Sequence, residues 1–201
     1  MLEEFLRRHD VDIALFQDVT IENNLVFQRY QTISNIGTLR RGTAIVSKLE
    51  INLHRIVRLP TGWGLVAHYA NTCIVNVYAP SGTANRTERE AFFNSELMDL
   101  LPHSPTEILM AGDFNCVLSN NDCTGHRSGS LSLERLINGL QLSDSWDASL
   151  PPHVFTHFTP AGAARLDRIY IAEGLRRNKQ GMETIAAAFT DHLTVLIRLN
   201  L

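Results

Sequence analysis

The sequence lacks several features that would assign the chain to a specialised class of protein. No apolar run approaches the roughly 20 residues of a membrane-spanning helix, and the start, MLEEFLRRHD, has no apolar signal-peptide core. The three cysteines form no C-x-x-C pair, which argues against structural zinc and favours a reducing, intracellular setting. No repeat, low-complexity tract or Pro/Gly-rich linker divides the 201 residues, so we expect one domain over 1–201.

An excess of charge of either sign is also lacking. The formal net charge is −3 at pH 7. Because nucleic-acid-binding proteins usually present a basic face, this balance argues weakly against a polyanionic partner. Some basic residues nevertheless gather along the chain, at Arg40-Arg41, Arg55 and Arg58, Arg165 and Arg168, and Arg176-Arg177-Lys179. The G-x-S-x-G sequence of a serine hydrolase elbow is absent as well.

Apolar runs separated by turn residues predict alternating strands and helices. Strands are expected at 12–17, 42–47, 51–59, 64–70, 72–79, 107–111, 153–158, 165–172, 184–189 and 193–199. Helices are expected at 1–9, at 132–140 and within 81–101, where Thr87 and Glu90 have the spacing of a capping box. Hairpins with helices inserted between them indicate an α/β fold whose mixed sheets pack face to face under outer helices.

Five of the predicted strand ends carry polar side chains at the point where an apolar run stops. They are Gln17-Asp18, Asn76 with Tyr78, Asp113 with Asn115, Asp167, and Asp191-His192. A single such end has a simple structural explanation, because Asp and Asn favour turns and helix caps. Five together predict a functional site, since loops at one rim of a sheet are where catalytic groups converge.

The chemistry that fits this set is metal-assisted attack on a phosphate ester. Magnesium takes carboxylate oxygens and keeps several waters, so one or two acids are enough to hold it. A phosphodiester also needs a base that positions water, donors for its negative oxygens, and compensation of the charge on the leaving oxygen. Asp, Asn, Tyr and a His beside acids supply these groups.

The motifs GDFN, NVYAP, RLDRIYIA and TDHLTV resemble, in that family's order, the endonuclease/exonuclease/phosphatase superfamily. The longer phrases MAGDFNCVLSNNDCTG and LSDSWDASLPPHVFTHF are similar to the apurinic-like endonuclease domain of non-LTR (LINE-type) retrotransposons. The resemblance implies a DNase I-like four-layered α/β sandwich, with two mixed sheets face to face and helices outside. It also implies a monomer that nicks one strand of double-stranded DNA, leaving a 3′-hydroxyl and a 5′-phosphate. The 3′-hydroxyl would prime a reverse transcriptase domain of the parent element, with Mg²⁺ (or Mn²⁺) as cofactor and access to the nucleus.

The resemblance assigns catalytic roles to five residues. Asp113 would orient or deprotonate the attacking water, and Asn115 would fix neighbouring groups and a phosphate oxygen. Tyr78 would donate its hydroxyl to the phosphate. His192 would stabilise the pentavalent transition state while Asp167 holds its imidazole in orientation.

The resemblance also assigns metal and substrate contacts. Asp18 and Asp191 would hold the metal. Asn76, Thr156 and Arg165 would contact the substrate, although Asn76 fits a purely supporting hydrogen-bonding role equally well. The family's usual metal ligand at the position of Asp18 is Glu. The shorter side chain retracts the carboxylate by about 1 Å, and a misplacement of that size costs on the order of 10²-fold in rate.

A second departure concerns the family's opening strand, which would precede the helix at 1–9. We therefore expect a chain truncated at its N-terminus, with an unpaired strand edge inside one sheet. Three alternatives remain open at this point: an endonuclease that repairs abasic sites, a phosphatase acting on an inositol or sphingolipid head group, and a non-catalytic remnant that binds DNA or protein.

Overall fold

The structure is a computed structural model that describes residues 1–20, 27–52, 55–101, 107–125, 129–146 and 154–200. Its largest sheet has six strands in the order β4-β5-β6-β7-β11-β8. They are β4 (Val57–Arg58), β5 (Gly64–Tyr69), β6 (Thr72–Tyr78), β7 (Glu107–Asp113), β11 (Asp167–Ile171) and β8 (Ser143–Asp144). Only β6 and β7 run parallel, and the other neighbours are antiparallel. The central strands are apolar and buried on both faces, as expected for a sheet covered on both sides.

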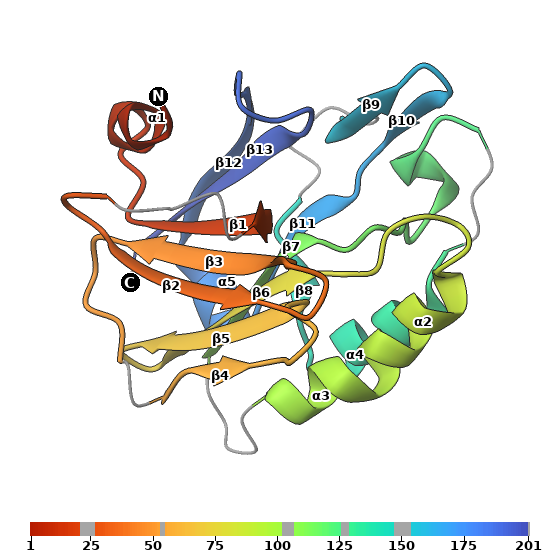
Figure 1. The fold of residues 1–201 in the computed structure, drawn as a ribbon, viewed down its shortest axis with the longest axis horizontal. Helices are drawn as coiled ribbons and strands as arrows, with labels where there is room; N and C mark the ends of the chain where they lie inside the picture. Colours follow the sequence, from red (N-terminus) through yellow and green to blue (C-terminus); the bar gives the residue numbers. More distant parts are fainter. Residues whose placement is uncertain (21–26, 53–54, 102–106, 126–128, 147–153, 201) are drawn as a thin grey trace.

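Helices cover one face of this sheet (Figure 1). They are α2 (Arg86–Ala91), the π-helical turn η2 (Phe92–Glu96), α3 (Leu97–Leu100) and α4 (Leu131–Gly139). Phe92, Phe93 and Leu133 are fully buried and pack with Val75 and Met110 of the sheet. This apolar contact fixes the helices because removing their aromatic faces from water is the main favourable term.

Two smaller sheets cover the opposite face. One has the order β1-β3-β2, formed by β1 (Ile13–Thr20), β3 (Arg41–Ser47) and β2 (Gln31–Ile36). The other pairs β12 (Lys179–Ala186) with β13 (Leu193–Leu199). The helix α1 (Leu2–Arg8) lies outside this layer (Figure 1). Its Leu6 packs against Tyr30 and Val46. The predicted α/β sandwich of four layers is therefore confirmed.

The two smaller sheets do not join into one among the described residues. β1 is an edge strand that pairs only with β3, and β13 pairs only with β12. A cavity of about 1710 Å³ adjoins both strands and is lined by Leu15, Ala111, Ile169 and Val195 among others. Among the described residues, the edges of β1 and β13 thus border the cavity that also reaches the strand ends.

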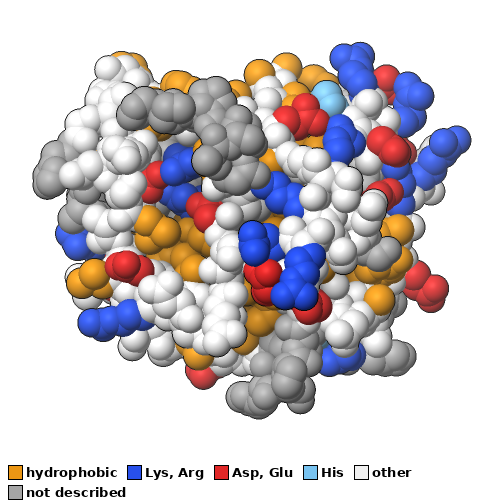
Figure 2. Space-filling model, turned by 180° about the vertical axis from the view of Figure 1, so that it is seen from behind, with side chains coloured by type: hydrophobic (Ala, Val, Ile, Leu, Met, Phe, Trp, Pro, Cys, Tyr) orange, Lys and Arg blue, Asp and Glu red, His pale blue; other side chains and the backbone are white. Residues whose placement is uncertain are grey.

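Short elements complete the described chain. The hairpin of β9 (His157–Thr159) and β10 (Gly162–Ala164) precedes β11 in the sequence, and α5 (Glu173–Arg177) follows β11. A 3₁₀ turn, η3 (Asn120–Asp122), follows β7. None of the described helices is long and apolar enough to cross a membrane. On the face opposite to that of Figure 1, basic and acidic side chains lie interspersed (Figure 2).

Several predicted elements differ from the structure. The strand expected at 51–59 is reduced to β4, with 53–54 outside the described residues, and β2 was not predicted. The strand expected at 153–158 is β9, which starts at His157, while residue 153 lies outside the described part. The predicted capping box is wrong, because α2 starts at Arg86 after Asn85. Glu90 instead accepts a hydrogen bond from the Ser132 amide at 3.0 Å, which ties α2 to α4.

Candidate active site

Two carboxylates meet because β7 and β11 pair in one register. Asp113 is the last residue of β7 and Asp167 the first of β11, and the antiparallel ladder places them directly opposite each other. Gly112, just before Asp113, has φ +142°, and a Cβ there would lie 1.9 Å from the carbonyl oxygen of Val77. The glycine of GDFN is therefore required because the backbone of β6 passes too close for a side chain.

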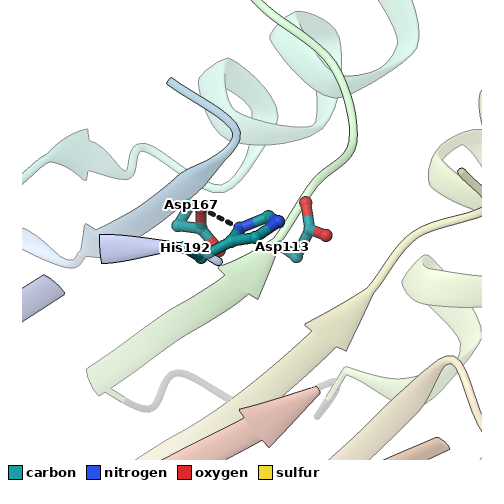
Figure 3. A group of neighbouring side chains, drawn as sticks. All are labelled: Asp113, Asp167 and His192. Atoms are coloured by element: carbon teal, nitrogen blue, oxygen red, sulfur yellow. Dashed lines mark hydrogen bonds and ion pairs between the residues drawn. The ribbon is translucent and has the colours of Figure 1, made fainter. Parts of the chain in front are cut away.

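The imidazole of His192, the residue just before β13, completes this cluster. Its Nδ1 lies 2.8 Å from Oδ2 of Asp167. One ligand atom each of Asp113, Asp167 and His192 lies within 4.8 Å of the others. Figure 3 shows the imidazole between the two carboxyl groups. Three side chains from distant parts of the sequence thus share one small site.

Burial and charge set the protonation states of this cluster. Asp113 is 6% exposed; burial, and next the negative charge of Asp167, raise the pKa of Asp113 to about 7. Burial alone would lower the pKa of His192, but the hydrogen bond and charge of Asp167, helped by Asp113 and Asp191, raise it to about 9. At neutral pH the imidazole is therefore cationic and Asp113 is close to its midpoint.

Asn115 and Tyr78 surround the Asp113 carboxylate. Asn115 has φ +50°, which turns the chain back, so its backbone N–H donates to Oδ1 of Asp113 at 2.9 Å and its Nδ2 donates to Oδ2 at 3.0 Å. The side chain of Phe114, between them, is fully buried and anchors the turn. Tyr78 ends β6 opposite Asp113 in the parallel register. Burial, and then the charge of Asp18, raise the pKa of Tyr78 to about 12, so its hydroxyl stays protonated.

Asp18 is turned out of its strand by a bulge. The register of β1 against β3 shifts between Phe16 and Val19, and Asp18 has φ +55°. Such bulges re-aim side chains next to functional sites. Both carboxylate oxygens of Asp18 lie 2.8 Å from Nη1 of Arg41. The pair is solvent-exposed, and Asp18 lines the cavity described above.

The donor set at the cavity fits a magnesium ion. Asp18, Asp113 and Asp191 all line it, together with Asp167, and Asp191 is exposed to solvent. Mg²⁺ prefers carboxylate oxygens and retains water, which an open cavity allows. Cys116 also lines the cavity, but burial raises the pKa of its thiol to about 12, and the cluster of possible metal ligands found among the described residues contains no cysteine. These oxygen donors therefore suit a hard divalent cation.

Comparison with known proteins decides the family. The model of the Endonuclease/Exonuclease/phosphatase family matches residues 1–192. The chain belongs to the endonuclease/exonuclease/phosphatase family. This agrees with the order of motifs in the sequence and with the strand-end site.

One relative of the chain within this family is a transposon protein. The "Transposon TX1 uncharacterized 149 kDa protein" of Xenopus laevis is 33% identical over 138 residues, which cover 64% of this chain. The match spans only 10% of that relative, so the chain corresponds to a small part of it. Over this stretch the chain is similar to a transposon protein, in agreement with the resemblance to retrotransposon endonuclease domains seen in the sequence.

Solved structures of the family share the fold. An AP endonuclease from Archaeoglobus fulgidus superposes with a TM-score of 0.80 at 15% identity, covering 100% of this chain and 93% of that one. A 3′ phosphatase from Neisseria bound to a product DNA hairpin gives a TM-score of 0.79 at 16% identity, with the same coverage. At this identity the likeness establishes the DNase I-like architecture.

Three residues expected to touch substrate make internal contacts in this family member. Asn76 is fully buried, and its Nδ2 donates to the carbonyls of Phe16 and Ala44. Thr156 is fully buried, and its hydroxyl accepts from the amides of Leu166 and Asp167 at 3.0 and 3.1 Å. These side chains are satisfied inside the protein, so they support the site from behind.

Arg165 makes internal contacts as well. It is ion-paired with Asp122, and its guanidinium lies 4.8 Å from the ring centre of Trp146. Asn76, Thr156 and Arg165 do not line the cavity in the described part of the chain. The structure instead fastens the loop around η3 to the start of β11 through this ion pair.

Sequence reasoning missed two residues next to the site. Arg41 contacts Asp18, and the ring of His157 lies with its centroid 4.5 Å from that of His192. The strands that bring them there are paired across long stretches of sequence, His157 with His192 and Thr20 with Arg41. No spacing in the sequence signals such contacts, because they depend on strand register.

Proposed function

We propose that this chain is a Mg²⁺-dependent endonuclease that hydrolyses a phosphodiester of double-stranded DNA and leaves a 3′-hydroxyl and a 5′-phosphate. The observation that carries the proposal is the convergence of Asp113, Asp167 and His192 within 4.8 Å of one another. Such a constellation offers a base, an oriented cation and acidic oxygens in one place, which phosphoryl hydrolysis requires. Family membership and the fold support it.

Asp113 is the residue that handles the attacking water. A pKa of about 7 makes its carboxylate an effective proton acceptor at neutral pH, since general bases work best near the operating pH. The two hydrogen bonds from Asn115 fix the direction of its oxygens. Water gives a proton to Asp113 and attacks phosphorus, the bond from phosphorus to the 3′ oxygen breaks, the 3′ oxygen takes up a proton from solvent, and the phosphate stays on the 5′ side.

His192 and Tyr78 donate to the phosphate oxygens. The imidazolium, held by Asp167, places a positive charge where negative charge increases in the transition state. The protonated hydroxyl of Tyr78 supplies a neutral donor from the neighbouring strand end. Thr156 positions this machinery, because it holds the backbone of Asp167 through its hydroxyl and of Leu193 through its carbonyl.

Asp18 and Asp191 are the residues proposed to hold the metal. When bound, Mg²⁺ or Mn²⁺ supplies compensation for the charge on the leaving oxygen. The 3′-hydroxyl so formed suits target-primed reverse transcription, and the relationship to a transposon protein supports that role. A reverse transcriptase domain of the same parent element is the proposed partner, and a DNA target implies access to the nucleus.

The test is nicking of supercoiled plasmid with Mg²⁺. Wild type is expected to yield open circles, and Asp113→Ala and His192→Ala are each expected to be slower by about 10²–10⁴-fold. Asp99→Ala, which removes an exposed carboxylate on α3, is the matched control and is expected to keep full activity. Open circles that a DNA polymerase extends without pretreatment establish the 3′-hydroxyl.

Two results separate this proposal from its competitors. Equal rates for wild type and both site variants would discard the assignment of the active site. Cleavage of a duplex with one abasic site, while the intact duplex stays uncut under the same conditions, would assign the chain to DNA repair instead.

A further inference from the structure

Arg41 forms an ion pair with Asp18, the carboxylate that the proposed function assigns to metal binding. Nη1 of Arg41 lies 2.8 Å from both Oδ1 and Oδ2 of Asp18, so a single nitrogen bridges the two oxygens. The contact follows from the fold: Arg41 opens β3 opposite Thr20, and the bulge in β1 turns Asp18 toward it. Charge-assisted contacts of this length are favourable for both partners.

Tyr78 is the third member of this contact. Besides burial, the largest cause, the charge of Asp18 raises the pKa of the Tyr78 hydroxyl whereas Arg41 lowers it, so the hydroxyl lies within electrostatic reach of both side chains. Asp18 and Tyr78 line the same cavity as Asp113. The guanidinium therefore contacts a carboxylate that lines the cavity of the proposed metal site.

The ion pair is open to exchange. The side chains of Arg41 and Asp18 are 59% and 48% exposed. Exposed pairs of this kind contribute little net free energy, because solvent screens them and both side chains lose freedom. A divalent cation has twice the charge of Arg41 and can displace it from Asp18. Metal binding must then include the cost of breaking the Arg41–Asp18 pair.

We propose that Arg41 is a built-in cation that competes with the divalent metal for the carboxylate of Asp18. The proposal rests on the proposed function, which gives Asp18 to the metal. Arg41 neutralises Asp18 in the metal-free protein and leaves it when the metal binds. Its removal therefore strengthens metal binding, whereas an arginine that merely orients Asp18 for the metal would weaken binding when removed. The two roles predict opposite signs.

The experiment measures Mn²⁺ binding without DNA, from the loss of the electron paramagnetic resonance signal of free Mn²⁺ on titration with protein. Arg41→Gln is expected to bind Mn²⁺ about two- to fivefold more tightly than wild type, the range set by an exposed ion pair. Arg40→Gln, the matched control, removes the same charge one residue away and is expected to stay near the wild-type dissociation constant. Asp18→Asn is expected to weaken binding. Arg41→Met repeats the test if Arg41→Gln does not fold.

The outcomes are distinct for the two proposals. Binding by the Arg41 variants equal to that of Arg40→Gln, or weaker than that of wild type, overturns the competition. Absence of Mn²⁺ binding in every variant overturns it too, because Asp18 then holds no ion to compete for. Tighter binding by the Arg41 variants together with no plasmid nicking leaves the competition standing and removes the endonuclease assignment alone.

Discussion

The buried amide of Asn76 helps to join the two sheets next to the site, and replacing it tests how the site is supported. Asn76 in β6 donates from Nδ2 to the carbonyl oxygens of Phe16 at 3.1 Å and Ala44 at 2.9 Å, and its Oδ1 accepts from Nε2 of Gln17 at 2.7 Å. The side chain is fully buried. Asn76 therefore fixes β1 just before Asp18.

Asn76→Asp keeps the size of the side chain and removes only the donor group. Two carbonyl oxygens then face a carboxyl oxygen, and each buried group that loses its partner costs about 1–3 kcal/mol. Each carbonyl oxygen loses only one of its two possible partners, because Phe16 and Ala44 remain paired in the β1–β3 ladder. We therefore expect the free energy of unfolding to fall by about 2–4 kcal/mol at pH 8.

The loss should also depend on pH. Burial beside carbonyl oxygens raises the pKa of the introduced carboxyl in the folded protein above its unfolded value. A group whose folded pKa is raised contributes stability below the unfolded pKa, and that contribution is lost as pH rises through the folded pKa. Asn76→Asp should therefore be closer to wild type at pH 5 than at pH 8.

The assay is urea unfolding followed by fluorescence of Trp63 and Trp146, at pH 5 and pH 8. The matched control is Asn71→Asp, the same chemical change at an exposed position in the turn of the same β5–β6 hairpin. A difference of less than about 1 kcal/mol between the two variants at pH 8 would refute the reasoning, because one unsatisfied group already costs that much. Greater stability of Asn76→Asp at pH 8 than at pH 5, each relative to wild type, would refute the pH argument.

Three further predictions concern the GDFN turn and the acid–imidazole pair. Phe114→Ala should lower the free energy of unfolding by about 3–5 kcal/mol, measured by urea titration, because the ring is fully buried; a loss under 1 kcal/mol would contradict this. Gly112→Ala should abolish cooperative thermal unfolding measured by circular dichroism, because φ is +142° and the added Cβ would lie 1.9 Å from a carbonyl oxygen. A melting temperature equal to that of wild type would contradict this. Asp167→Asn in EDTA should lower the pKa of His192 from about 9 by about 1–3 units in an NMR titration. An unchanged titration would mean that another group raises it.

The central strands and the polar residues at their ends could be predicted from the sequence, because an apolar run followed by polar residues is a local pattern. The run from Ile108 to Ala111 predicted a buried strand, and β7 is found there. Asp113, Asp167 and His192 were selected as strand-end residues, and they converge. The failures were elements without a clear local period: β2, with Gln, Thr, Ser and Asn among its six residues, was overlooked.

The sequence by itself determined the mixed α/β class and the inventory of acids, amide, hydroxyl and imidazole, and the order of its motifs, through their resemblance to a known superfamily, pointed to the family and the layers. Only the tertiary structure decided which of those groups stay available. In the folded protein Asn76 and Thr156 make internal hydrogen bonds. Arg41 forms an ion pair with Asp18, and the ring of His157 contacts that of His192. The physical reason is that a polar side chain's partner is set by strand register and bulges, which join residues far apart in the chain.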